Sequence, residues 1–204
     1  MAYLVALNGS PVRKSSVDLL LDQVCAGYRE AGGEAEQLYL NDLWVKPCQA
    51  CGPEPTSGYC IFHDDMDLVY QNLERADAVA VGSPIFFDAV SAQLKLVIDR
   101  CNCVTPLVPR AGGGETFRAK WERARRGVFV TVSGPRQRHD MAERCVRGFM
   151  KWVGTKWEET LAFVHEDNEL GSVIRDPGLL ERAREVGRRL GKSAPLEPAG
   201  TGPA

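Results

Sequence analysis

The chain has 204 residues, of which 44% are hydrophobic and 25% are charged, and its formal net charge is −2 at pH 7. These proportions are typical of a globular domain, and no basic excess is available to neutralise phosphates, so we expect no nucleic-acid partner. No apolar run reaches the roughly 20 residues of a membrane helix, so we also expect no membrane partner. The N-terminal stretch is too short and too poor in basic residues for a secretory signal, which predicts a cytoplasmic location.

Short apolar runs alternate with amphipathic segments along the chain. Strands are expected at residues 3–7, 34–40, 78–82, 127–134 and 156–166, and helices at 16–33, 64–77, 89–101, 138–154 and 176–191. Asp176 and Pro177 suit the start of the last helix, and Asp64 or Asp65 suits the start of the second. Residues 102–126 form a long connection, with a short helix expected at 117–126.

This alternation predicts an α/β fold in which a parallel sheet is covered by helices on both faces. We expect a single domain over residues 1–191, followed by a disordered Pro- and Gly-rich tail at 192–204. Such sheets bind ligands beyond the carboxyl ends of their strands. The rule directs attention to the loops after the first, third and fourth strands.

The first loop, "NGSPVRKSSV", leaves a strand and enters a helix. Its hydroxyls (Ser10, Ser15 and Ser16) and the helix N-terminus can surround an anion, and Arg13 and Lys14 add positive charge. The loop lacks the glycine spacing of a nucleoside-triphosphate or dinucleotide site. It therefore suggests a single monophosphate, with a serine-rich helix cap that holds no ligand as the alternative.

The two other loops carry aromatic and small residues. "GSPIFFDAVS" places Pro84, Phe86 and Phe87 directly after a buried strand, where apolar groups suit a flat heteroaromatic ring. "SGPRQRHD" begins with Ser133 and Gly134, which let the backbone approach a ligand closely. The alternatives are a loop packed by its own phenylalanines and a solvated turn.

The stretches "LNGSPVRKSS", "CQACGPEPTSGYCIFHDDM" and "ERADAVAVGSPIFFDAVSAQLKLVIDR" resemble the flavodoxin-like NAD(P)H-dependent FMN reductase family, in its iron–sulfur-flavoprotein-like branch. The resemblance implies a flavodoxin-like three-layer sandwich with a five-stranded parallel sheet and bound FMN. It also implies a homodimer or homotetramer in which a neighbouring subunit helps to close the flavin site. The cofactor-binding residues carried over from it are Ser10, Val12, Arg13, Ser15, Ser16, Val17, Pro84, Ile85, Phe86, Phe87, Asp88, Ser133 and Gly134.

The sequence departs from this family at three points. Val17 stands where a threonine is frequent, Phe86 stands where a tyrosine is common, and Asp88 and Ala92 replace frequent glycines. The first change removes one hydroxyl from the phosphate loop, and Asp88 adds a carboxylate near the edge of the cofactor.

The resemblance implies an FMN-dependent NAD(P)H oxidoreductase that works by a ping-pong mechanism on a small acceptor: a quinone, a nitro or azo compound, free flavin or a metal ion. The chemistry is centred on the flavin, so no catalytic side chain is assigned. The alternatives are a flavin-binding electron carrier or redox sensor, and a protein that keeps the fold without the cofactor. The three histidines are expected to be surface or capping residues, His165 among them.

Cys48, Cys51 and Cys60 form a candidate metal loop in "PCQACGPEPTSGYC". Iron–sulfur flavoproteins carry four cysteines in such a run, and here Glu54 stands at the third position, so one of the four usual thiolate ligands of a cluster is missing. An iron–sulfur cluster, a zinc site completed by Glu54 or His63, and a dithiol therefore stay open. A bare thiol loop beside the flavin is the preferred reading. We expect Cys25 and Cys145 in the core, and Cys101 and Cys103 away from the ligand edge.

Overall fold

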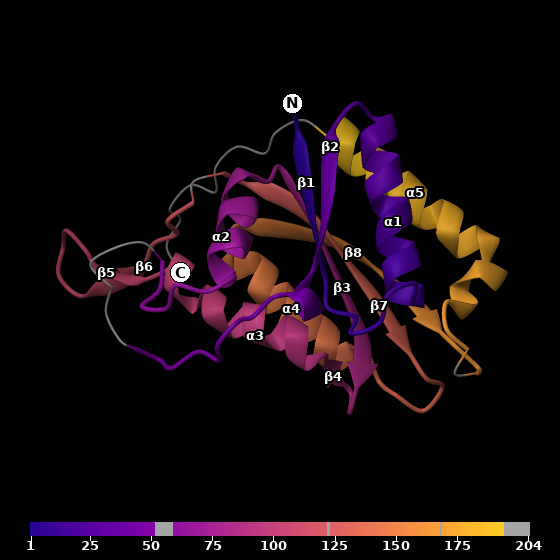
Figure 1. Cartoon of the computed structure of the whole chain (residues 1–204). Helices are drawn as coiled ribbons and strands as arrows, with labels where there is room; N and C mark the ends of the chain where they lie inside the picture. Colours follow the sequence, from indigo (N-terminus) through magenta and orange to yellow (C-terminus); the bar gives the residue numbers. More distant parts are fainter. Residues whose placement is uncertain (52–58, 122, 168, 194–204) are drawn as a thin grey trace.

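The computed structural model describes residues 1–51, 59–121, 123–167 and 169–193, and a five-stranded parallel sheet forms its centre (Figure 1). The strand order is β2-β1-β3-β7-β8. The strands are β1 (Tyr3–Asn8), β2 (Glu34–Tyr39), β3 (Ala78–Phe86), β7 (Arg125–Ser133) and β8 (Thr155–Val164). A two-residue strand, β4 (Ala89–Val90), pairs antiparallel with the end of β3. The predicted α/β fold with a five-stranded parallel sheet is confirmed.

Helices cover both faces of the sheet and make a three-layer sandwich (Figure 1). One face carries α1 (Ser16–Glu30) and α5 (Pro177–Lys192); the other carries α2 (Met66–Arg75), α3 (Ala92–Arg100) and α4 (Asp140–Trp152). The short 3-10 turns are η1 (Leu40–Asp42), η2 (Cys101–Val104) and η3 (Ser172–Arg175). Within the described ranges, no helix is long and apolar enough to cross a membrane.

Strand residues alternate between two separate cores, as a two-sided sheet requires. On β3, Val79 and Val81 pack toward α2, α3 and α4, whereas Ala78 and Ala80 pack toward α1 and α5. α5 begins with Pro177 after the Asp176 cap, whose carboxylate accepts from the Leu179 N–H at 2.9 Å, as the sequence predicted. The helix ends at Lys192, and the predicted tail from residue 194 onward lies outside the described residues.

The connection before β7 differs from the prediction. The helix expected at 117–126 is wrong. The connection contains a hairpin of β5 (Leu107–Pro109) and β6 (Glu115–Phe117), and β7 already begins at Arg125. Trp121 is buried, and its Nε1 donates to the Tyr59 hydroxyl at 2.8 Å. Trp121 therefore contacts a residue 62 positions earlier in the sequence. The local pattern of charged residues, on which the helix prediction rested, cannot indicate such a contact.

Arg125 is fully buried at the start of β7 and ties two helix ends to the sheet. Its guanidinium donates to the carbonyls of Ala76 at 2.9 Å and Glu74 at 3.2 Å, after and within α2, and to the Val153 carbonyl at 2.6 Å after α4. Carbonyls at helix C-termini carry partial negative charge and lack intrahelical donors. Burial, aided by the nearby Arg123, lowers the pKa of Arg125 to about 10.

A buried ion pair fixes the base of the cysteine loop. The Arg100 guanidinium on α3 donates to both carboxylate oxygens of Asp64, at 2.7 and 3.0 Å, and both side chains are almost completely buried. Asp64 also accepts from the Lys46 N–H at 3.0 Å, and Arg100 donates to the Lys46 carbonyl at 2.9 Å. Both ends of the segment between Lys46 and Asp64 are therefore held against α3.

Asp64→Asn should destabilise the fold strongly, because it leaves the buried Arg100 guanidinium without a counter-charge. We expect the free energy of unfolding in urea to fall by about 3 kcal/mol or more. The matched control is Asp99→Asn, which removes the exposed Lys95–Asp99 pair and should change stability little. Equal effects of the two changes would contradict the structural role of the buried pair.

The contribution of Asp64 should also depend on pH. Burial raises its pKa, but hydrogen bonds from Arg100 and from the N–H groups of Lys46 and Met66 outweigh this, so the pKa lies below its usual value. Such a group stabilises above the unfolded-state pKa of about 3.9 and loses that contribution as the pH falls through its folded-state pKa. The stability difference between wild type and Asp64→Asn should therefore be full at pH 7 and shrink below about pH 4. A difference that stays constant from pH 7 to pH 3 would refute the assignment.

Candidate functional site

The first and third strands of the sheet approach each other closely at their carboxyl ends. The Gly9 N–H donates to the Gly82 carbonyl at 2.8 Å, and the Ser91 hydroxyl donates to the Gly9 carbonyl at 2.7 Å. A Cβ on Gly9 would lie 2.9 Å from that Gly82 oxygen, so no side chain fits there without a shift. The loop after β1 is thereby held beside the loop after β3, as the sequence predicted for the carboxyl edge.

The loop after β1 is shaped from behind by a buried carboxylate. Asp18 accepts from the Lys14 N–H at 2.6 Å and from the Asn8 amide at 3.2 Å. The Ser15 hydroxyl caps α1 by accepting from the Asp18 N–H at 3.3 Å, and it lies 2.9 Å from the Ser10 hydroxyl. The hydroxyls therefore gather at the N-terminus of α1, where the helix dipole is positive.

This loop forms one wall of a cavity of about 200 Å³. The lining residues from the loop after β1, the start of α1 and the end of β3 are Ser10, Pro11, Val12, Ser15, Ser16, Val17, Pro84 and Phe86. Val132 at the end of β7 and the segment after β8 supply the rest. Seven of the residues predicted for cofactor binding are thus brought together: Ser10, Val12, Ser15, Ser16, Val17, Pro84 and Phe86.

Strand alternation explains which side chains reach the cavity. Pro84 and Phe86 follow Ala80 in the alternation of β3, on the α1 side of the sheet, and the intervening Ile85 is buried in the core with α2, α3 and α4. Ile85 therefore offers its backbone rather than its side chain to the ligand edge. Its carbonyl already accepts from the Gln137 amide at 2.7 Å.

Other predicted residues lie outside the lining of this cavity. The Arg13 guanidinium stacks on the Tyr39 ring at 3.4 Å and pairs with Asp42. Phe87 is fully exposed at the tip of the β3–β4 turn. The neighbouring Asp88 carboxylate accepts from the Arg138 N–H at 2.8 Å.

Ser133 and Gly134 follow the lining residue Val132 at the same edge of the sheet but do not themselves line the cavity. The buried Ser133 accepts at its carbonyl from the His165 N–H at 3.0 Å, and the Gly134 N–H donates to the Gln137 side chain at 2.6 Å. The third predicted loop is therefore placed at the same edge and braced internally.

Sequence reasoning missed the segment after β8, which forms the opposite wall. His165, Asp167, Glu169, Leu170, Gly171 and Ser172 line the cavity. Gly171 has a φ of 69°, and a Cβ there would lie 2.8 Å from the Lys14 carbonyl, so this segment presses on the first loop. Ligands bind beyond the carboxyl ends of parallel strands, and this holds for the fifth strand of the sheet as well. The sequence could therefore have indicated this segment as part of the site.

Arg175 offsets part of the negative charge of this segment. Arg175 pairs with Asp167 at 2.8 Å and also with Glu169. The guanidinium of Arg175 lowers the pKa of the Asp167 carboxyl. Two carboxylates near the α1 N-terminus therefore have their own cation, which reduces their repulsion of an anion bound there.

The candidate metal loop is described only in part. Cys48 and Cys60 are half-buried and Cys51 is exposed, while Glu54 lies outside the described residues. In the portion of the chain that is described, no group of three or more potential ligands comes together. Cys101 is buried, and Cys103 Sγ lies 3.3 Å from the Tyr70 hydroxyl in the α2–α3–α4 core.

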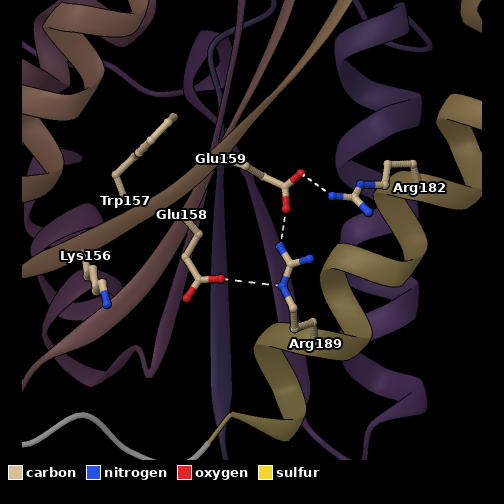
Figure 2. Close-up of a pocket in the computed structure, with 6 residues that line it drawn as sticks. All are labelled: Lys156, Trp157, Glu158, Glu159, Arg182 and Arg189. Atoms are coloured by element: carbon tan, nitrogen blue, oxygen red, sulfur yellow. Dashed lines mark hydrogen bonds and ion pairs between the residues drawn. The ribbon is translucent and has the colours of Figure 1, made fainter.

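A second hollow, beside the edge strand β8, is occupied by its own ion pairs. Figure 2 shows Glu159 between Arg182, at 2.9 Å, and Arg189, while Glu158 approaches Arg189 at 3.5 Å. Glu158 also pairs with Arg126 at 2.6 Å. Its glutamates and arginines already pair with one another, so this hollow offers a ligand less than the cavity at the carboxyl edge.

The residues of the cavity fit a flavin mononucleotide. Three hydroxyls at a helix N-terminus suit a phosphate, and Pro84 with Phe86 gives an apolar wall for a flat ring. His165 Nδ1 is buried and, among the described residues, has no hydrogen-bond partner, so the imidazole keeps one unused hydrogen-bonding atom.

Comparisons with known proteins agree with the fold. An azoreductase of Bacillus anthracis superposes with a TM-score of 0.65 at 16% identity, over 93% of this chain and 100% of that one. An NAD(P)H:quinone oxidoreductase of Methanothermobacter marburgensis gives a TM-score of 0.60 at 22% identity, over 93% and 98%. At these identities the likeness concerns the fold.

Sequence relatives are named iron–sulfur flavoproteins. One from Methanocaldococcus jannaschii is 34% identical over 97 residues, 48% of this chain and 50% of the relative. Another from the same organism is 28% identical over 146 residues, 70% of this chain and 68% of the relative. The first alignment thus spans half of the relative's length. The model of the family described as NADPH-dependent FMN reductase matches residues 2–158. The chain belongs to the NADPH-dependent FMN reductase family.

Proposed function

We propose that the protein is an FMN-dependent NAD(P)H oxidoreductase that passes electrons to a small acceptor. The observation that carries this proposal is that one cavity is lined both by three hydroxyls at the α1 N-terminus and by the apolar side chains of Pro84 and Phe86. A flavin mononucleotide needs both kinds of surface, one for its phosphate and one for its ring. Membership of the FMN reductase family supports the same cofactor.

The chain's residues bind and orient the cofactor in this proposal. Ser10, Ser15 and Ser16 hold the phosphate, and Val17 closes the base of the loop where a further hydroxyl is absent. Pro84 and Phe86 lie along the ring. When bound, FMN supplies reversible transfer of electrons between NAD(P)H and the acceptor.

The mechanism is proposed to be ping-pong, with one open site used first by NAD(P)H and then by the acceptor. The protein excludes water and orients the reactants, and we assign no general acid or base. The acceptor is a quinone, a nitro or azo compound, free flavin or a metal ion.

We propose that the protein works as a homodimer or homotetramer. Apolar side chains remain exposed at the rim of the cavity: Phe87 is fully exposed, and Val12 and Phe86 are about half exposed. An apolar rim of this kind favours contact with a second surface, which supports closure of the site by a neighbouring subunit.

A second candidate is an electron carrier or redox sensor that holds an iron–sulfur cluster at Cys48, Cys51 and Cys60. The names of the sequence relatives favour it. The position of Glu54 in place of a fourth cysteine disfavours it, because such clusters normally take four thiolates.

Anaerobic titration of the purified protein tests the proposed function. We expect a yellow protein whose flavin absorbance is bleached by NADH or NADPH and restored by a quinone. Bound flavin that neither nucleotide reduces would refute the oxidoreductase and leave the carrier. Broad brown absorbance, with several iron atoms per chain, would support the cluster-bearing alternative.

Ser15→Gly should weaken the binding of FMN while changing riboflavin binding little. Glycine is tolerated at a helix cap, so the main loss is a hydroxyl to the phosphate, which corresponds to about tenfold in affinity. Asp176→Gly makes the same kind of cap change at α5, outside the cavity, and should alter neither affinity. Fluorescence titration measures both ligands, and an equal loss for FMN and riboflavin would argue against a phosphate role for Ser15.

A further inference from the structure

His165 is the histidine that the structure moves from the surface into the site. It follows the end of β8, and it is one of the residues that line the cavity together with Pro84 and Phe86. It continues the alternation of Leu161 and Phe163, whose side chains face α1 and α5. The sheet therefore directs this side chain to the face on which the cavity lies.

The backbone of His165 is anchored to the loop after β7. Its N–H donates to the Ser133 carbonyl at 3.0 Å, and its Cε1 atom lies 3.8 Å from the position that a Cβ on Gly134 would take. The hydroxyls of the first loop lie against a different part of the same segment, where the Val173 N–H donates to the Ser16 hydroxyl at 3.2 Å. His165 therefore lies beside the loop after β7, and the serine hydroxyls proposed to hold the phosphate contact a later part of its segment.

The imidazole has an unused hydrogen-bonding atom. Nδ1 is buried without a hydrogen-bond partner in the part of the chain that the structure describes. Leaving a buried polar atom unsatisfied costs about 1–3 kcal/mol, so such an atom calls for an explanation. Because the terminal torsion of histidine is roughly two-fold, a half-turn of the ring can present this nitrogen to the cavity.

We propose that His165 is a cofactor-binding residue whose imidazole hydrogen-bonds to the polar edge of the flavin ring. This inference rests on the proposed function, since it assigns a contact to the same cofactor. The ring edge carries carbonyl oxygens and nitrogens, so it can pair with a neutral imidazole as donor or acceptor. The contact fixes the in-plane orientation of the ring, which the apolar wall of Pro84 and Phe86 leaves free.

Binding titrations with FMN and riboflavin test the assignment. His165→Phe keeps the ring shape and removes both nitrogens, so we expect about a tenfold loss of affinity for both ligands. His165→Asn keeps a short polar side chain and should recover most of the loss. Glu166→Gln changes an exposed neighbour outside the cavity and serves as the control. A loss confined to FMN, or no loss in His165→Phe, overturns the ring contact.

Nitrogen NMR of the imidazoles gives a readout that needs neither turnover nor a folded variant. The chain has three histidines, so their ring signals are easily distinguished. Riboflavin added to the wild-type protein should shift the ring nitrogens of His165, and absence of a shift with bound flavin refutes the proposal. Wild-type protein that binds neither flavin would instead refute the proposed function, and the inference with it.

Discussion

The close approach of β1 and β3 at their carboxyl ends is the constraint from which the site follows. Gly9 donates to Gly82 across 2.8 Å, and a Cβ on Gly82 would lie 2.6 Å from a Leu21 methyl carbon on α1. Gly82 therefore allows α1 to pack closely on β3, and Gly9 leaves room for Ser91 and Leu94 at the start of α3. The serine-rich loop after β1 and the end of β3, with Pro84 and Phe86, are neighbours for this reason. A polar site for a phosphate and an apolar wall for a ring then share one cavity, although Val17 and Pro84 are 67 positions apart in the sequence.

The two loops nearest the ring site are braced by each other. Gln137 accepts from the Gly134 N–H and donates to the Ile85 carbonyl, at 2.6 and 2.7 Å. Asp88 accepts from the Arg138 N–H at 2.8 Å. These bonds join the turn after β3 to the loop after β7 before any ligand is present. Orientation that is built into the protein in this way lowers the ordering that binding would otherwise require.

Much of the fold was predictable because apolar periodicity along this chain reports burial directly. The five strands and the placement of their loops at one edge follow from alternation and chain order. The hairpin before β7 could not be predicted, since the Trp121–Tyr59 bond and the burial of Arg125 depend on contacts distant in sequence. The role of the segment after β8 was missed for another reason. In the sequence, His165 is only a polar residue at the end of a strand. The folded chain places it in the same cavity lining as Pro84 and leaves its Nδ1 without a hydrogen-bond partner among the described residues.

The turn between β3 and β4 shows what holds the ring wall in place. Phe87 and Asp88 both have positive φ, 53° and 61°, where glycine or asparagine is favoured in two-residue hairpins. The Asp88 carboxylate is held by the hydrogen bond that it accepts from the Arg138 N–H. The pairing of Phe86 with Ala89 and of Ile85 with Val90 makes these two residues a two-residue loop, whose favoured turns need positive φ. A one-residue shift of β4 against β3 would instead exchange the faces of Ala89 and Val90, and Val90 is buried in the core. Burial of Val90 opposite Ile85 therefore fixes the register of the strained turn, next to Phe86 at the cavity.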